Sequence, residues 1–112
     1  MAAVGRRRFG KTGREVTVAG LGGEGVLRTF GRHEEAKAVI LEAIEQGITY
    51  FDSAKVYAGS EDYHGEVWRN RPDLREGVFL ASKSASRLHA DAEMDLQETL
   101  QRMGVETLDL WQ

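Results

Sequence analysis

A carboxylate, a phenol and an amine follow two short apolar runs in this sequence. Asp52 and Tyr57 come after residues 48–51, and Lys83 comes directly after residues 78–82. Because the carboxyl ends of parallel strands meet at one edge of an α/β sheet, we expect these three side chains to lie close together. Ligands bind and chemistry occurs at that edge. Asp52, Tyr57 and Lys83 are therefore the candidate catalytic residues.

An amine beside a phenol changes what the phenol can do with its proton. A free phenol has a pKa near ~10 and is a poor acid at neutral pH. An ammonium about 4 Å away, at an effective dielectric constant near ~20, favours the phenolate by about 4 kcal/mol. Such a phenol, with Asp52 orienting Lys83, suits protonation of a carbonyl oxygen while hydride attacks the carbon. From residue types alone, a structural ion pair beside an ordinary Tyr57 remains the favoured alternative.

The elements that must position these residues recur along the chain about every 30 residues, which is the length of one βα unit. Strand-like runs open near Val18, Ile48, Val78 and Thr107. Helical patterns cover residues 34–46, 60–70 and 91–103. Gly47 and Gly104 are placed to end the first and last helix. The strands are nearly continuous apolar runs, as is typical of a parallel sheet covered by helices.

A hairpin precedes these units. Residues 7–9 and 15–17 flank a glycine-containing turn, and a second turn is predicted at residues 70–73, around Pro72. We therefore predict an α/β fold in which residues 1–17 carry the hairpin and residues 18–112 form four strands alternating with three helices. At 112 residues the chain is short for a complete α/β barrel, which takes about 250.

Composition excludes several function classes. The 18 acidic and 15 basic residues nearly balance, which argues against a nucleic-acid surface. There is no cysteine for a disulfide or a thiolate metal site, and no apolar run long enough for a membrane span. The three histidines, His33, His64 and His89, lack metal-ligand spacing, so no metal site is predicted. We expect a soluble, cytoplasmic protein.

Two glycine patterns suggest nucleotide binding. Residues 5–12 match the phosphate-loop pattern, but no buried strand precedes them and a β-branched stretch follows, so we favour a hairpin turn. Residues 20–25 match the dinucleotide pattern and follow a strand. However, residues 26–31 intervene before the helix, and Asp52 lies well beyond the usual spacing of about 20 residues. A Rossmann-type module is a minor alternative, and it requires a helix that starts between Gly23 and Gly25.

Several stretches of the chain resemble the aldo-keto reductases. They are residues 8–13 followed by residues 18–23, residues 50–61 with Gly65, residues 79–83 and residues 109–112. They occur in the family's order and span nearly the whole chain. The resemblance implies that residues 1–112 are the amino-terminal half of a (β/α)8 TIM barrel. It also implies an oxidoreductase that uses NADPH, with NADH as an alternative, to reduce aldehydes or ketones to alcohols.

The resemblance also implies residue roles. Tyr57 matches the family's general acid, and Lys83 with Asp52 matches the pair that tunes it. Gly22 and Gly23 match the first strand-end loop near the nicotinamide, and Asp52 also lies near the cofactor ribose.

The family's catalytic histidine falls just beyond the position of Gln112. We therefore expect a truncated chain that is inactive by itself. One alternative is a non-catalytic fragment. Another is a homodimer in which two half-barrels associate through their exposed sheet edges.

Overall fold

The centre of the molecule is a parallel sheet of four strands in the order β3, β4, β5, β6. The structure is a computed structural model that describes residues 4–112, so residues 1–3 of the predicted segment 1–17 lie outside the described residues. The strands are β3 (Gly20–Leu21), β4 (Tyr50–Asp52), β5 (Phe79–Ser82) and β6 (Leu110–Trp111). Consecutive strands are connected through helices, so the predicted βα arrangement is confirmed.

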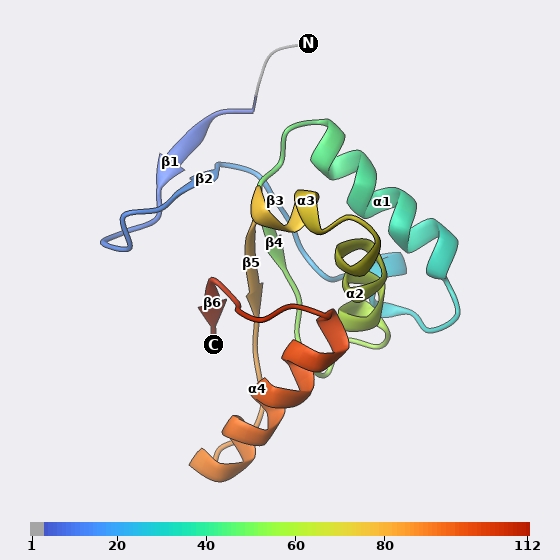
Figure 1. Cartoon of the computed structure of the whole chain (residues 1–112), viewed down its shortest axis with the longest axis vertical. Helices are drawn as coiled ribbons and strands as arrows, with labels where there is room; N and C mark the ends of the chain where they lie inside the picture. The colour runs from blue at the N-terminus through green and yellow to red at the C-terminus, as the bar shows by residue number, and fades with distance from the viewer. Residues whose placement is uncertain (1–3) are drawn as a thin grey trace.

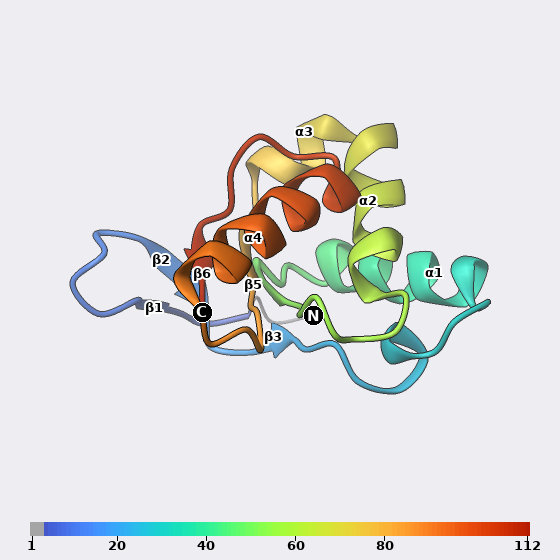
Figure 2. The ribbon, with the colours of Figure 1, turned by 90° about the horizontal axis from the view of Figure 1, so that it is seen from below.

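Helices cover one face of this sheet. They are α1 (His33–Glu45), α2 (Ser60–Asn70), α3 (Pro72–Glu76) and α4 (His89–Met103), with a 3-10 turn η1 (Gly25–Arg28) before α1. The helix α2 lies between α1 and α4 and packs against both (Figures 1 and 2). Among residues 4–112, no helix is long and apolar enough to cross a membrane.

Strand alternation explains the core. Phe51 and Leu80 are paired across β4 and β5, and both point toward the helices with no exposed surface. There they join apolar side chains of α1, α2 and α4, namely Ile40, Val67, Trp68 and Met103. Burying a side chain of this size contributes about 1.5–3 kcal/mol. The next residue along each strand therefore faces the other side of the sheet.

A β-hairpin crosses the amino end of the sheet. Its strands β1 (Arg6–Arg8) and β2 (Glu15–Thr17) pair antiparallel. The turn uses glycines with positive φ, 55° at Gly10 and 77° at Gly13, a conformation that glycine adopts without strain. Phe9 contacts the rings of Tyr50 and Phe79, with ring centroids 5.7 and 5.0 Å away. The hairpin in this way covers the first residues of β4 and β5.

Several boundaries differ from the prediction. The strands begin one to three residues later and are shorter than the apolar runs, because only part of each run pairs with a neighbour. The break predicted at residues 70–73 is present but shorter, since α2 ends at Asn70 and only Arg71 is not helical. Pro72 opens the short helix α3, where its missing N–H is no loss. The helix ends at Gly47 and Gly104 are confirmed by positive φ values of 92° and 63°.

Both glycine patterns have structures other than nucleotide loops. Residues 5–12 lie in the hairpin, as expected. The single 3-10 turn η1 begins at Gly25 and ends at Arg28, and α1 begins only at His33. The Rossmann alternative requires an α-helix that starts between Gly23 and Gly25, and only this four-residue 3-10 turn starts there, so the alternative is wrong.

Candidate active site

The three candidate residues lie at the carboxyl end of the sheet on neighbouring segments. Asp52 is the last residue of β4, and Lys83 directly follows β5. Tyr57 lies in the loop between β4 and α2. This loop is tied to the end of β5 by a backbone bond in which Lys55 N donates to Lys83 O at 3.0 Å. The expectation that strand ends bring these residues together is therefore met.

The Lys83 ammonium is the centre of the group. Its Nζ donates to Asp52 Oδ2 at 2.6 Å and to the backbone oxygen of Ser53 at 2.8 Å. The same nitrogen lies 4.8 Å from the centroid of the Tyr57 ring. The Lys83 and Asp52 side chains are 27% and 29% exposed, so the pair is open to a ligand while remaining partly shielded from water.

The surroundings of Lys83 favour its charged form. Partial burial by itself would lower the pKa of this amine. The hydrogen bond and negative charge of Asp52, with a smaller contribution from Tyr57, outweigh burial and raise the pKa above its ordinary value. Lys83 is therefore a cation held against a carboxylate and beside a phenol, the arrangement expected from the residue types.

Tyr57 is positioned by the loop after β3. A methyl group added at Gly23 would lie 2.5 Å from Cδ2 of the Tyr57 ring, so the ring occupies the space that a side chain would fill. At Gly22, by contrast, no atom of the described residues lies within 4 Å of such a position, so its backbone is open to close approach. The two predicted glycines thus have different surroundings.

Sequence reasoning missed Arg28. Its guanidinium carbon lies 4.5 Å from the centroid of the Tyr57 ring, and its Nη1 donates to Glu24 Oε1 at 2.7 Å. The Arg28 guanidinium therefore lies over part of the Tyr57 ring. Glu24 and Arg28 are four residues apart, which is the spacing of an ion pair within one helical turn. This spacing was the sequence signal for the turn that brings Arg28 to Tyr57.

Chemically, the group offers a phenol next to a cation and an open backbone segment at the rim of a parallel sheet. A model of the aldo/keto reductase family matches residues 19–112. The chain belongs to the aldo-keto reductase family.

Individual members of the aldo-keto reductases show how much of the fold is present. The chain is 27% identical over 100 residues to glycerol 2-dehydrogenase (NADP(+)) of Saccharomyces cerevisiae, covering 89% of this chain and 30% of that protein. A solved thermostable aldo-keto reductase in complex with the inhibitor epalrestat matches with a TM-score of 0.82 and 30% identity, over 95% of this chain and 41% of that one.

An aldo-keto reductase from Klebsiella pneumoniae in complex with NADPH matches with a TM-score of 0.79 and 25% identity, over 98% of this chain and 39% of its own. The chain thus spans less than half the length of each of these three proteins. The predicted partial (β/α)8 barrel is confirmed.

Proposed function

We propose that this chain contributes the proton-donating part of an NADPH-dependent reductase that converts aldehydes or ketones to alcohols. The observation that carries the proposal is the Lys83 ammonium, which is 2.6 Å from Asp52 Oδ2 and 4.8 Å from the centre of the Tyr57 ring. Family membership and the names of the relatives, an NADP(+)-dependent dehydrogenase and an NADPH complex, support it.

In the proposed reaction, the Tyr57 hydroxyl donates its proton to the carbonyl oxygen of the substrate. Negative charge then develops on the phenol oxygen, and the neighbouring Lys83 ammonium stabilises it. Asp52 keeps Lys83 charged and fixes where its nitrogen lies. A proton donor that is stabilised as it loses its proton is the main contribution of this chain to catalysis.

The rim of the sheet fits the nicotinamide end of a cofactor. Gly22 leaves its backbone open, and Asp52 presents a partly exposed carboxylate that can accept a hydrogen bond from a ribose hydroxyl. Gly23 admits the Tyr57 ring, and its own contact with the cofactor stays a prediction. When bound, NADPH supplies the hydride, and NADH is the alternative donor. A reductase of this kind with a small carbonyl substrate suits a cytoplasmic location.

We further propose that residues 1–112 alone have little or no reductase activity. The sheet of four strands is covered by helices on one face (Figure 2). Among residues 4–112, the face that carries Asp52 is covered by the hairpin only at its amino end. Water therefore has access to the proposed reaction site, and water weakens the electrostatic stabilisation on which proton transfer depends.

The test replaces the matching segment of the thermostable relative with residues 1–112, so that a complete barrel surrounds these side chains. NADPH oxidation with a simple aldehyde is then followed by absorbance. Tyr57→Phe is expected to lower kcat by about 10²–10⁴-fold, the usual contribution of a general acid. Retention of the full rate by Tyr57→Phe would contradict the proposal.

Tyr50→Phe is the matched control for this experiment. Tyr50 is a phenol on the face of β4 that also carries Asp52. Burial and the negative charge of Asp52 raise the pKa of Tyr50, although the charge of Lys83 acts in the opposite direction. It contacts the aromatic rings at the hairpin end. Its replacement is expected to leave kcat unchanged within about twofold, since it lies outside the proposed proton path.

A second candidate, self-association, is favoured by the sheet edges. Among the described residues, β3 and β6 each pair with one strand only, so each has an edge with free backbone donors and acceptors. We propose that two copies associate through these edges. Light scattering is expected to give the mass of a dimer, and a stable, folded monomer would count against it.

A further inference from the structure

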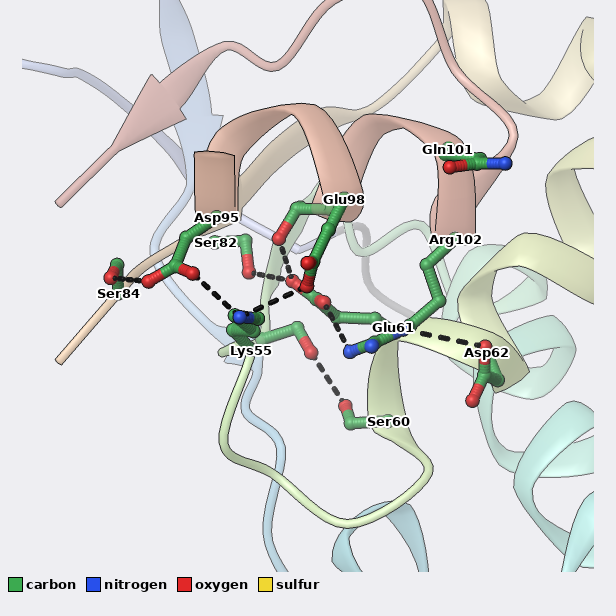
Figure 3. Close-up of polar contacts among 12 residues, drawn as sticks. Lys55, Ser60, Glu61, Asp62, Ser82, Ser84, Asp95, Glu98, Gln101 and Arg102 are labelled. Atoms are coloured by element: carbon green, nitrogen blue, oxygen red, sulfur yellow. Dashed lines mark hydrogen bonds and ion pairs between the residues drawn. The ribbon is translucent and has the colours of Figure 1, made fainter. Parts of the chain in front are cut away.

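A carboxylate lies fully buried behind the sheet, on the side opposite Lys83. Glu61, the second residue of α2, is 1% exposed. Its Oε2 accepts hydrogen bonds from Ser82 Oγ at 2.6 Å and from Thr99 Oγ1 at 2.8 Å, and Arg102 Nη1 lies 3.3 Å from its Oε1 (Figure 3). A buried carboxylate is costly unless such partners satisfy it. The buried Glu61 carboxylate therefore holds these three partners within hydrogen-bond distance of its oxygens.

One partner of Glu61 is next to Lys83 in the sequence. Successive residues of a strand point to opposite faces, so the fully buried Ser82 points toward α2 while Lys83 points toward the open rim. The bond from Ser82 to Glu61 thus fixes the strand end immediately before Lys83. Thr99, the other hydroxyl donor, lies on α4 and fixes only the packing of that helix against α2.

The residue after Asp52 is fixed in the same way. Ser53 Oγ donates to Ser60 Oγ at 2.7 Å, and both serines are fully buried. Ser60 and Glu61 are the first two residues of α2, and Figure 3 shows Glu61 reaching Ser82 from this helix. The start of α2 therefore holds the strand ends that carry Asp52 and Lys83.

The neighbour on the other side of Lys83 is also bonded to a carboxylate. Ser84 Oγ donates to Asp95 Oδ2 on α4, and Ser84 N donates to the backbone oxygen of Gln112 at 2.9 Å. The groups in contact with the Lys83 ammonium itself are the Asp52 carboxylate, the backbone oxygen of Ser53 and the ring of Tyr57. A shift of the backbone at Ser82 would therefore move the amine relative to all of them.

We propose that Glu61 is a positioning residue, which acts through the Ser82 hydroxyl to hold the Lys83 amine against Asp52 and Tyr57. Its catalytic consequence rests on the proposed function, but its structural effect on Lys83 does not. Glu61 touches no reacting atom in this account. The alternative is that Glu61 only links α2 to α4, in which case loss of the Thr99 bond and loss of the Ser82 bond should have the same consequences.

The experiment compares Ser82→Ala with Thr99→Val in the 112-residue chain. Each variant removes one hydroxyl donor to the same oxygen of Glu61, so both are expected to lower the melting temperature similarly. Lys83 reactivity is measured by competitive acetylation with acetic anhydride and mass spectrometry, with the exposed Lys11 as internal reference. Ser82→Ala is expected to raise the relative acetylation rate of Lys83 about fivefold, roughly the effect of one hydrogen bond. Thr99→Val is expected to leave it unchanged.

A third variant tests the carboxylate itself. Glu61→Ala is expected to raise Lys83 acetylation at least as much as Ser82→Ala, and Ser82→Ala remains decisive if Glu61→Ala does not fold. Unchanged acetylation in Ser82→Ala, or an equal increase in Thr99→Val, would overturn the proposal. Because acetylation needs neither cofactor nor turnover, this result is separate from the reductase test, in which loss of Tyr57 is decisive.

Discussion

The two ends of the parallel sheet are built from the same strands but have opposite chemistry. At the amino end, Tyr50 and Phe79 have ring centroids 5.3 Å apart and pack against Phe9 of the hairpin. Two residues further along β4, on the same face, Asp52 binds Lys83. In α/β barrels the amino end contributes stability and the carboxyl end carries catalysis. The proposed site and the aromatic cluster divide the four-stranded sheet in the same way.

The energetics of the two ends differ accordingly. Phe79 is 3% exposed and its ring is surrounded by aromatic neighbours. The Lys83–Asp52 pair is 27% and 29% exposed, and a pair of this exposure contributes about 1 kcal/mol or less to folding. Changes at the amino end should therefore affect unfolding, and changes at the carboxyl end should affect catalysis.

Phe79→Ala is expected to have the largest effect and to act on stability. Removing a buried aromatic ring leaves a cavity and costs about 3–5 kcal/mol. Urea denaturation measures this loss. The control is Phe30→Ala, because Phe30 is 74% exposed and its removal should change the unfolding free energy by about 0.5 kcal/mol or less. Equal losses in the two variants would remove the contrast between the ends.

Gly23→Ala is expected to have the next largest effect and to act on catalysis. The new methyl group would lie 2.5 Å from Tyr57 Cδ2, so the ring must move. Misplacing a catalytic group by about 1 Å can cost about 10²-fold in rate, which is the loss expected for kcat in the chimeric barrel. Gly77→Ala is the matched control, since Gly77 lies outside the proposed site and its added methyl group would meet Leu74 O at 3.7 Å, an ordinary contact distance. An unchanged kcat in Gly23→Ala would show that Tyr57 is not restrained there.

A smaller effect is expected at Asp95, a residue of α4 that contacts side chains in the loops after β4 and β5. The hydrogen bond from Lys55, followed by those from Ser84 and Ser86, holds the pKa of Asp95 far below its ordinary value of 3.8. The stability that these contacts contribute is therefore complete above pH ~4 and is lost as the pH falls further. Asp95→Asn is expected to be less stable than the unmodified chain at pH 7.

The pH dependence of unfolding checks this prediction. Between pH 7 and pH 3, the unfolding free energy of Asp95→Asn should fall less than that of the unmodified chain. The control is Asp91→Asn on the same helix, where the carboxylate is exposed. An equal fall in the unfolding free energy of Asp95→Asn and of the unmodified chain would show that Asp95 does not contribute in this way.

The sequence predicted the positions of Asp52, Tyr57 and Lys83 because strand alternation and parallel pairing determine which side chains reach the rim. It also predicted the helix ends at Gly47 and Gly104, where backbone geometry favours one residue type.

Contacts between distant side chains were not predictable in this way. Arg28 reaches Tyr57 only because a 3-10 turn follows the glycines, and Glu61 meets Ser82 and Thr99 only when two helices pack on the sheet. Such contacts depend on tertiary packing, which residue spacing does not encode. The start of α3 at Pro72 was missed because proline marks both a turn and a first helical residue.

The central claim is that Tyr57 and Lys83 act as one unit at the carboxyl end of the sheet. A double-mutant cycle in the chimeric barrel tests it most directly, with kcat measured for Tyr57→Phe, Lys83→Met and the double variant. Residues that act as a unit have strongly non-additive effects, so the double variant is expected to be no slower than Tyr57→Phe alone. A double variant whose loss equals the product of the two single losses would contradict the claim.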